Sequence, residues 1–107
     1  MRPSRDESES AMSRNSLFEF RLYVAGDAQN SVQAVANLNA LCQAHLPDRH
    51  RIEVVDVFQH PKRALEDGIF ITPTLVKLAP PPLRKIVGTL NERQLVLQAL
   101  GLETRAA

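Results

Sequence analysis

The hydrophobic residues of this chain change repeatedly between two kinds of spacing, and this alternation limits the folds that it can adopt. Over residues 17–24 apolar side chains recur at every second position, with Phe18 and Leu22 among those on one face, which predicts a strand. Beyond Gly26 the apolar positions follow the spacing of a helix, which Pro47 ends. The ordered part therefore begins with a strand followed by a long helix.

The long helix is predicted to carry one apolar stripe. Asn30 or Ser31 is expected to accept backbone N–H bonds as its N-cap. We expect the stripe to be buried, because a helix of a globular domain turns its apolar side to the core. The residues at helical spacing are Val32, Val35, Leu38, Leu41, Cys42 and His45.

The rest of the chain continues the alternation in shorter segments. Residues 52–58 are rich in β-branched side chains and predict a second strand. Pro61 suits the first turn of a short helix over residues 62–67, which Gly68 ends. Two short strands and a last helix are then expected at residues 74–78, 84–87 and 91–100.

The last helix has a recognisable signal at each end. Asn91, with Gln94 three residues on, resembles a capping box. Gly101 follows Leu100 and can adopt the left-handed conformation that ends many helices. We therefore expect the C-terminus of the domain to be helical.

The order strand, helix, strand, helix, strand, strand, helix predicts an α/β domain with a thioredoxin-like core and one mixed sheet. Its first two strands would be parallel with a right-handed crossover, and its last two would form an antiparallel hairpin. The domain is expected to cover residues 17–102. Residues 1–16 contain five serines and alternating charges, so we expect a disordered tail there, and a short C-terminal tail at 103–107.

Composition excludes several classes of function. Thirteen Lys and Arg against twelve Asp and Glu leave a formal net charge of +1, which argues against a nucleic-acid surface. No apolar run approaches the roughly 20 residues needed to span a bilayer, and the N-terminus lacks the apolar segment of a secretory signal. A single cysteine, Cys42, excludes an internal disulfide. We expect a cytoplasmic protein without membrane or nucleic-acid partners.

A thioredoxin-like topology invites a redox interpretation, which the residues argue against. That chemistry needs a low-pKa thiolate at the turn from the first strand into the first helix, and residues 26–31 contain no cysteine. Cys42 lies on the apolar stripe, where burial would disfavour its ionisation. The histidines at 45, 50 and 60 lack ligand spacing, so no metal or other cofactor is expected. Adjacent Glu66 and Asp67 are interpreted as a solvated helix end.

Two proline segments stand beside the predicted third strand. Pro73 follows Thr72 directly before it, at the place where thioredoxin-like proteins usually hold a cis proline, although an ordinary trans bond is open as well. Pro80, Pro81 and Pro82 form the loop after it. This loop is either a stiff hairpin connection or a slow gate for rearrangement, because proline isomerisation takes tens of seconds.

Taken together, residues 17–102 resemble the KaiB family. The segments that carry the resemblance are Leu-Tyr-Val-Ala-Gly at 22–26, Asn-Ser at 30–31, Val-Asp-Val at 55–57 with Pro61, Glu-Asp at 66–67, Thr-Pro-Thr-Leu at 72–75 and Pro-Pro-Pro-Leu-Arg-Lys-Ile-Val-Gly at 80–88. No one of them is decisive alone, whereas their order and spacing form a specific combination.

The resemblance implies a non-enzymatic adaptor that changes fold. KaiB proteins interconvert between a βαββααβ ground state, usually tetrameric, and a monomeric thioredoxin-like form. The second form binds the N-terminal ring of the ATPase KaiC and then engages KaiA or output histidine kinases. The same fold occurs as the sensor domain of SasA-type kinases. Proline isomers at Pro73 and in residues 80–82 differ between the two folds.

Two departures from the family pattern are informative. Where relatives commonly have Gly-Leu-Asp near the C-terminus, this chain has Ala99, Leu100 and Gly101, and Ala is about 1 kcal/mol better than Gly inside a helix. Both changes favour the helical C-terminus of the thioredoxin-like form, so we expect the binding-competent fold to predominate. Together with the prolines at 73 and 80–82, Ala99 and Gly101 are our candidate fold-switch residues.

The partner-binding positions depart as well. Three that are typically basic in cyanobacterial relatives are Gln33, Glu53 and Gly68 here, while Arg84 and Lys85 remain basic. These five are our candidate partner-binding residues. Because interface charges mainly set association rate and specificity, the changes predict a cognate, diverged KaiC-like ATPase rather than a standard cyanobacterial one.

The sequence therefore predicts a KaiB-like adaptor of a KaiC-type ATPase, in a circadian clock, an hourglass timer or a stress response. Two alternatives stay open. One is a thioredoxin-like oxidoreductase, which the missing Cys-x-x-Cys disfavours. The other is a sensor-type binding module that docks on a partner other than KaiC.

Overall fold

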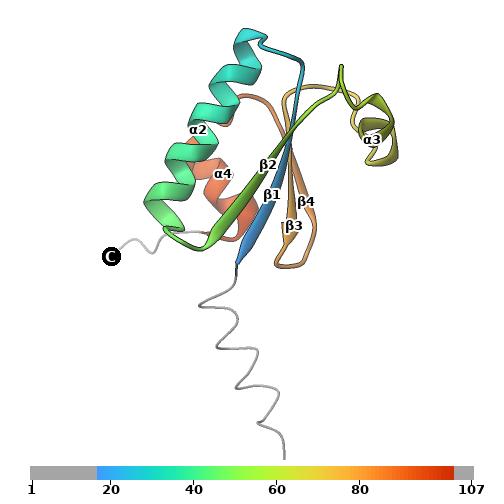
Figure 1. The fold of residues 1–107 in the computed structure, drawn as a ribbon. Coiled ribbons are helices and arrows are strands. Elements are labelled where there is room, and N and C mark those ends of the chain that lie inside the picture. The colour runs from blue at the N-terminus through green and yellow to red at the C-terminus, as the bar shows by residue number, and fades with distance from the viewer. Residues whose placement is uncertain (1–16, 103–107) are drawn as a thin grey trace, which may run out of the picture.

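The computed structural model describes residues 17–102, and the two expected tails lie outside them. It contains four strands and three helices in the order strand, helix, strand, helix, strand, strand, helix (Figure 1). They are β1 (Phe18–Val24), α2 (Gln29–His45), β2 (His50–Asp56), α3 (Pro61–Glu66), β3 (Thr74–Ala79), β4 (Arg84–Val87) and α4 (Arg93–Leu100). The predicted order of elements is confirmed.

The strands form one mixed sheet in the order β2-β1-β3-β4. β1 and β2 are parallel, with Leu22 opposite Val54, and α2 provides the crossover between them. β3 is antiparallel to β1 and to β4, so β3 and β4 form the expected hairpin. This is the thioredoxin-like α/β fold predicted from the sequence.

The main core lies between the sheet and the pair α2 and α4, which lie together on one side of it (Figure 1). β1 contributes alternate residues to this core, and the buried stripe of α2 packs on them, as its spacing predicts. The buried side chains of β1 and α2 in this core are Phe18, Phe20, Leu22, Val24, Ala34, Leu38, Leu41 and Cys42. Val32 does not belong to the stripe: it is exposed beside a shallow cavity against β2.

A smaller apolar cluster lies on the opposite face of the sheet, under α3. It consists of Tyr23, Val55 and Val76 from the three longer strands together with Ala64 and Ile69 from α3 and the following segment. Because α3 has only six residues, it covers one end of this face, and charged side chains of β1, β2 and β4 lie on the rest of it. The two faces of the sheet are therefore covered unequally.

The predicted helix caps are wrong, whereas the predicted C-terminal glycine is confirmed. α2 begins at Gln29, so its N-cap is Ala28, which has no polar side chain, and Ser31 lies inside the helix with its hydroxyl accepting the Ala25 N–H at 3.0 Å. α4 begins at Arg93 without a side-chain cap, so Asn91 and Gln94 form no capping box. Gly101 is left-handed (φ 77°) and its N–H bonds to the Gln98 carbonyl at 3.1 Å.

The second strand begins and ends earlier than predicted. It starts at His50 because that residue pairs with Phe18 at the beginning of β1. It ends at Asp56 because that carboxylate accepts the N–H of Phe58 at 2.9 Å and turns the chain away from the sheet. The bonds that precede Pro73, Pro80 and Pro82 are cis, and the bond that precedes Pro81 is not among the cis bonds.

Candidate partner-binding surface

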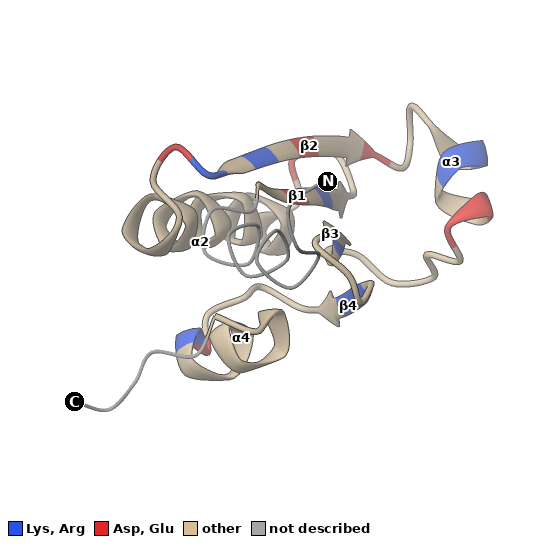
Figure 2. Cartoon of the chain, turned by 90° about the horizontal axis from the view of Figure 1, so that it is seen from below, with Lys and Arg blue, Asp and Glu red and all other residues tan. Residues whose placement is uncertain are grey.

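Three of the five candidate partner-binding residues lie on the face of the sheet that α3 partly covers. Glu53 is on β2, Lys85 is on β4, and Gly68 follows α3. Figure 2 shows acidic and basic segments on β2 and α3 and a basic segment on β4, whereas α2 carries no Lys, Arg, Asp or Glu along its length. The charged surface of the domain is thus displaced from its longest helix.

Arg21 of β1 joins the charged groups of this face. Its Nε lies 2.9 Å from Glu53 Oε1 and its Nη1 lies 3.0 Å from Asp67 Oδ2. Arg63 of α3 also pairs with Glu53, with Nη1 2.9 Å from Oε2. Hydrogen bonds from Arg63 and Arg21 lower the pKa of Glu53 to about 2. Glu53 therefore acts as the bridge between β1 and α3, and it stays ionised at neutral pH.

Tyr23 anchors the other end of this network. Its ring is fully buried in the smaller cluster and its hydroxyl donates to Asp67 Oδ2. This hydrogen bond and the Arg21 pair hold the pKa of Asp67 below its ordinary value, although partial burial opposes them. Burial raises the pKa of Tyr23, and the hydrogen bond to Asp67 and the charge of that carboxylate raise it further. Asp67 is consequently a structural anchor rather than the solvated helix end that the sequence suggested.

Gly68 and Lys85 are in direct proximity. Gly68 has φ +69°, and a β-carbon placed on it would lie 3.5 Å from Lys85 Nζ. Lys85 Nζ donates to the Asp67 carbonyl at 2.6 Å. The absence of a side chain at Gly68 therefore suits both the left-handed turn and the position of the ammonium group.

Gln33 and Arg84 lie apart from this cluster. Gln33 is exposed on the uncharged helix α2. Arg84 precedes Lys85 on β4, so its side chain leaves the strand on the opposite face. The register of the hairpin places Arg84 opposite Lys77 of β3. The structure thus brings together Glu53, Gly68 and Lys85 and leaves the other two candidates on the side of α2 and α4.

Several large apolar side chains near α3 are exposed, which no pattern in the sequence indicated. They flank α3 in the two loops that connect it to β2 and β3, or lie on α3 itself. Such exposure marks a surface suited to contact with another molecule. These residues are Phe58, Leu65, Phe70 and Ile71.

Sequence reasoning missed the four residues that organise the charged surface. Arg21 and Tyr23 alternate with the core residues of β1, so the two-residue period already placed them on the other face. No comparable signal identified Arg63 or Asp67, which lie on α3 and at its end. Their partners, Glu53 and Arg21 respectively, lie on strands that are distant in the sequence. Only the folded chain brings those pairs together.

Cys42 is placed as predicted and is unsuited to thiol chemistry. It is fully buried in the main core, and burial raises the pKa of its thiol to about 12. A thiol with that pKa stays protonated at neutral pH and cannot act as the nucleophile of a disulfide exchange. Among residues 17–102 no group of three His, Cys, Asp or Glu side chains could hold a metal ion.

Within the described part of the chain, none of the helices combines the length and apolarity that crossing a bilayer requires.

The fold is that of solved thioredoxins. Chloroplastic thioredoxin z matches with a TM-score of 0.67 over 94% of this chain and 90% of its own, and at 17% identity the likeness shows the fold alone. The N-terminal domain of Synechococcus elongatus SasA matches with a TM-score of 0.57 and 25% identity, over 85% of this chain and 90% of that chain.

Sequence comparison identifies the family. The circadian clock protein KaiB3 of Synechocystis is 45% identical over 83 residues, which are 78% of this chain and 79% of that protein. The circadian clock oscillator protein KaiB of Acaryochloris marina is 44% identical over 79% of this chain and 82% of its own. The model of the KaiB domain matches residues 21–102. The predicted resemblance is confirmed, and the chain belongs to the KaiB family.

Proposed function

We propose that this protein is a non-enzymatic adaptor of a timing or stress-response system, and that it binds a KaiC-type ATPase as a thioredoxin-like monomer. KaiA or an output histidine kinase is a further candidate partner once that complex has formed. The observation that carries the proposal is that a chain of this family has the thioredoxin-like topology, with the C-terminal helix α4 packed into the main core.

Two departures from the family pattern support the thioredoxin-like form as the resting fold. Ala99 lies inside α4, and Gly101 ends the helix in the left-handed conformation. A second backbone bond closes the same helix end, because the Leu102 N–H donates to the Leu97 carbonyl at 2.7 Å. An advantage of about 1 kcal/mol for Ala over Gly changes a two-state population about fivefold.

The charge of the binding surface supports a diverged partner. Glu53 is engaged by Arg21 and Arg63, so this part of the surface holds a mixed charge network in place of a free basic group. Arg84 and Lys85 keep basic charge at β4. Since interface charges select partners mainly through association rate and mismatch, we expect the cognate ATPase to differ from cyanobacterial KaiC at the matching positions.

Binding to the ATPase is tested with the purified full-length chain and the KaiC-type protein of the same organism, separately loaded with ATP and ADP. We expect nucleotide-dependent co-elution in size-exclusion chromatography, and weaker binding to a cyanobacterial KaiC. Glu53→Lys should reduce the difference in affinity between the cognate ATPase and the cyanobacterial KaiC. Glu66→Lys, at an exposed acid outside the network, is its charge-matched control. Absence of binding to the cognate ATPase in both nucleotide states contradicts the proposal.

The resting fold is tested without any partner. The double variant Ala99→Gly with Gly101→Asp restores the family pattern, and we expect it to lose α4 and to form the larger ground-state oligomer. Backbone NMR shifts of residues 93–100 report the helix, and light scattering reports the mass. A wild-type chain that is already a tetramer without α4 contradicts this part of the proposal.

A further inference from the structure

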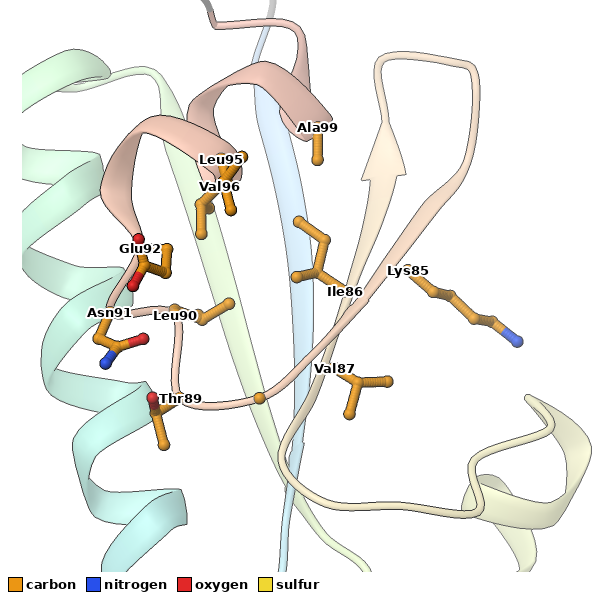
Figure 3. Close-up of a pocket in the computed structure, with 11 residues that line it drawn as sticks. Lys85, Ile86, Val87, Thr89, Leu90, Asn91, Glu92, Leu95, Val96 and Ala99 are labelled. Carbon is orange, nitrogen blue, oxygen red and sulfur yellow. The ribbon is translucent and has the colours of Figure 1, made fainter.

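The free edge of β4 has a groove beside it that the function proposed above does not use. β4 is the last strand in the order β2-β1-β3-β4, so within residues 17–102 no strand pairs with its outer side. A cavity of about 610 Å³ lies between β4 and α4. Figure 3 shows Ile86 of β4 and Leu95, Val96 and Ala99 of α4 pointing into this space.

The backbone groups on the free edge belong to Lys85 and Val87. The Gly88 N–H bonds to the Pro73 carbonyl at 2.9 Å, and Thr74 lies opposite Val87, so Gly88 and Pro73 are a hydrogen-bonded pair. Such pairs recur at every second residue of an antiparallel ladder. The N–H and C=O groups of Lys85 and Val87 therefore point outward, in the spacing that an added strand requires.

The side chains beside this edge define what an added strand must carry. Ile86 faces the groove, while Lys85 and Val87 face the other side of the sheet, and Figure 3 shows Lys85 directed away from α4. Val87 is 57% exposed and Leu95 is 62% exposed, so both present apolar surface to solvent. A strand paired with β4 would place an apolar side chain in the groove opposite Ile86.

Charge determines which strand fits. Arg84 and Lys85 are consecutive on this four-residue edge strand, and neither takes part in an ion pair among the described residues. Pairing two copies of β4 antiparallel would place four cations in one short ribbon, where like charges repel. The opposite end of the groove carries Glu92. An acidic segment at the Arg84 end is therefore favoured over a second copy of this chain.

We propose that β4 and the adjoining groove bind an extended peptide segment of another protein, one that alternates apolar with acidic residues and pairs with β4 as a fifth strand. The apolar residue enters the groove between Ile86 and α4, and the acidic residues, which point to the other face of the sheet, lie near Lys85. Ala99 contributes to this site because its small side chain leaves the groove open along α4. The proposal does not depend on which ATPase the protein binds.

The probe is a fluorescein-labelled peptide of alternating Asp and Leu, titrated into the full-length chain and followed by anisotropy. Its controls are the same peptide with a central proline, which cannot pair, and with Lys in place of Asp. We expect saturable binding of the first peptide alone, and slowed hydrogen exchange at the amides of Lys85 and Val87. Equal binding of all three peptides, or protection of β2 amides instead, overturns the proposal.

Two variants that leave the candidate ATPase-binding residues intact locate the site. Ala99→Leu keeps helix propensity and fills the groove, and Val87→Pro removes an outward N–H without removing a ladder bond. We expect each to weaken the peptide about tenfold or more, with circular dichroism unchanged for Ala99→Leu. Unchanged affinity in Ala99→Leu, or dimerisation of the free chain that Val87→Pro abolishes, overturns the proposal. Neither result bears on binding to the ATPase, which is measured separately.

Discussion

The two faces of the sheet are built from the same strands and yet are held in different ways. On the face of α2 and α4, alternate residues of β1 meet two helices in one continuous apolar core. On the other face, α3 covers a small cluster, and the remainder is joined by Arg21, Glu53, Arg63 and Asp67. The first face determines whether the chain folds, because burial of apolar surface is the dominant favourable contribution. The second can change its charges at small cost, so it is where partner choice can diverge.

The two edges of the sheet also differ in charge. β2 carries the exposed Val54, beside Val32 of α2, and its Glu53 is paired with two arginines. The β4 edge carries Arg84 and Lys85 without an ion pair in the described residues. A segment that pairs with one edge therefore meets a different electrostatic environment from a segment at the other.

The largest loss of stability is expected from a cavity in the core of the first face. Leu97 is buried on α4, so Leu97→Ala should lower the free energy of unfolding by about 2–5 kcal/mol, through lost burial and the cavity that remains. Leu95 lies two residues away on the same helix and is exposed. Leu95→Ala, its matched control, should change stability by about 0.5 kcal/mol or less. Urea denaturation measures both, and equal losses would mean that α4 does not pack as described.

The fold was largely predictable because its signal is local. The two-residue period of β1 and the helical period of α2 are visible in consecutive residues, and they place Phe20 and Leu38 in the core. The helix caps were not predictable, because Ser31 bonds to Ala25 across the preceding turn rather than to its own helix. The end of β2 was missed because the side chain of Asp56 turns a β-branched-rich segment away from the sheet.

The charged surface was less predictable because its partners are far apart in the sequence. Glu53 and Lys85 were identified through the family pattern, whereas Arg21 and Asp67 meet across 46 residues. No spacing rule connects a strand position with a position after α3, since only the folded chain brings them together. Gln33 and Arg84 show the reverse. The family resemblance grouped them with Glu53, Gly68 and Lys85, and the fold places them on the side of α2 and α4 instead.

A smaller effect is expected from the anchor of the second face. Tyr23→Phe keeps the buried ring and removes the hydroxyl that donates to Asp67. We expect a loss of about 1.5–3 kcal/mol, the usual range for a hydrogen bond to a charged group. The pKa of Asp67 should rise, because that hydrogen bond is the main influence lowering it. Carboxyl NMR titration measures the pKa, and urea denaturation measures the loss. Glu66→Gln, at the exposed neighbouring acid, is the control, and an unchanged Asp67 titration would contradict the assignment of this contact.

The smallest effect, and the sharpest in its pH dependence, concerns Glu53. Its side chain is 47% exposed, so solvent screens its pairs with Arg21 and Arg63, and Glu53→Gln should cost about 0.2–1 kcal/mol per pair at neutral pH. The folded-state pKa of Glu53 is lowered from 4.5 to about 2. Its stabilisation is therefore fully present above pH 4.5 and is lost as the pH falls toward 2. The difference in unfolding free energy between wild type and Glu53→Gln should accordingly shrink across that interval and should also shrink in high salt. A difference that persists at pH 2 would mean that Glu53 acts through packing, and the second face would then resemble the first more closely than its charges indicate.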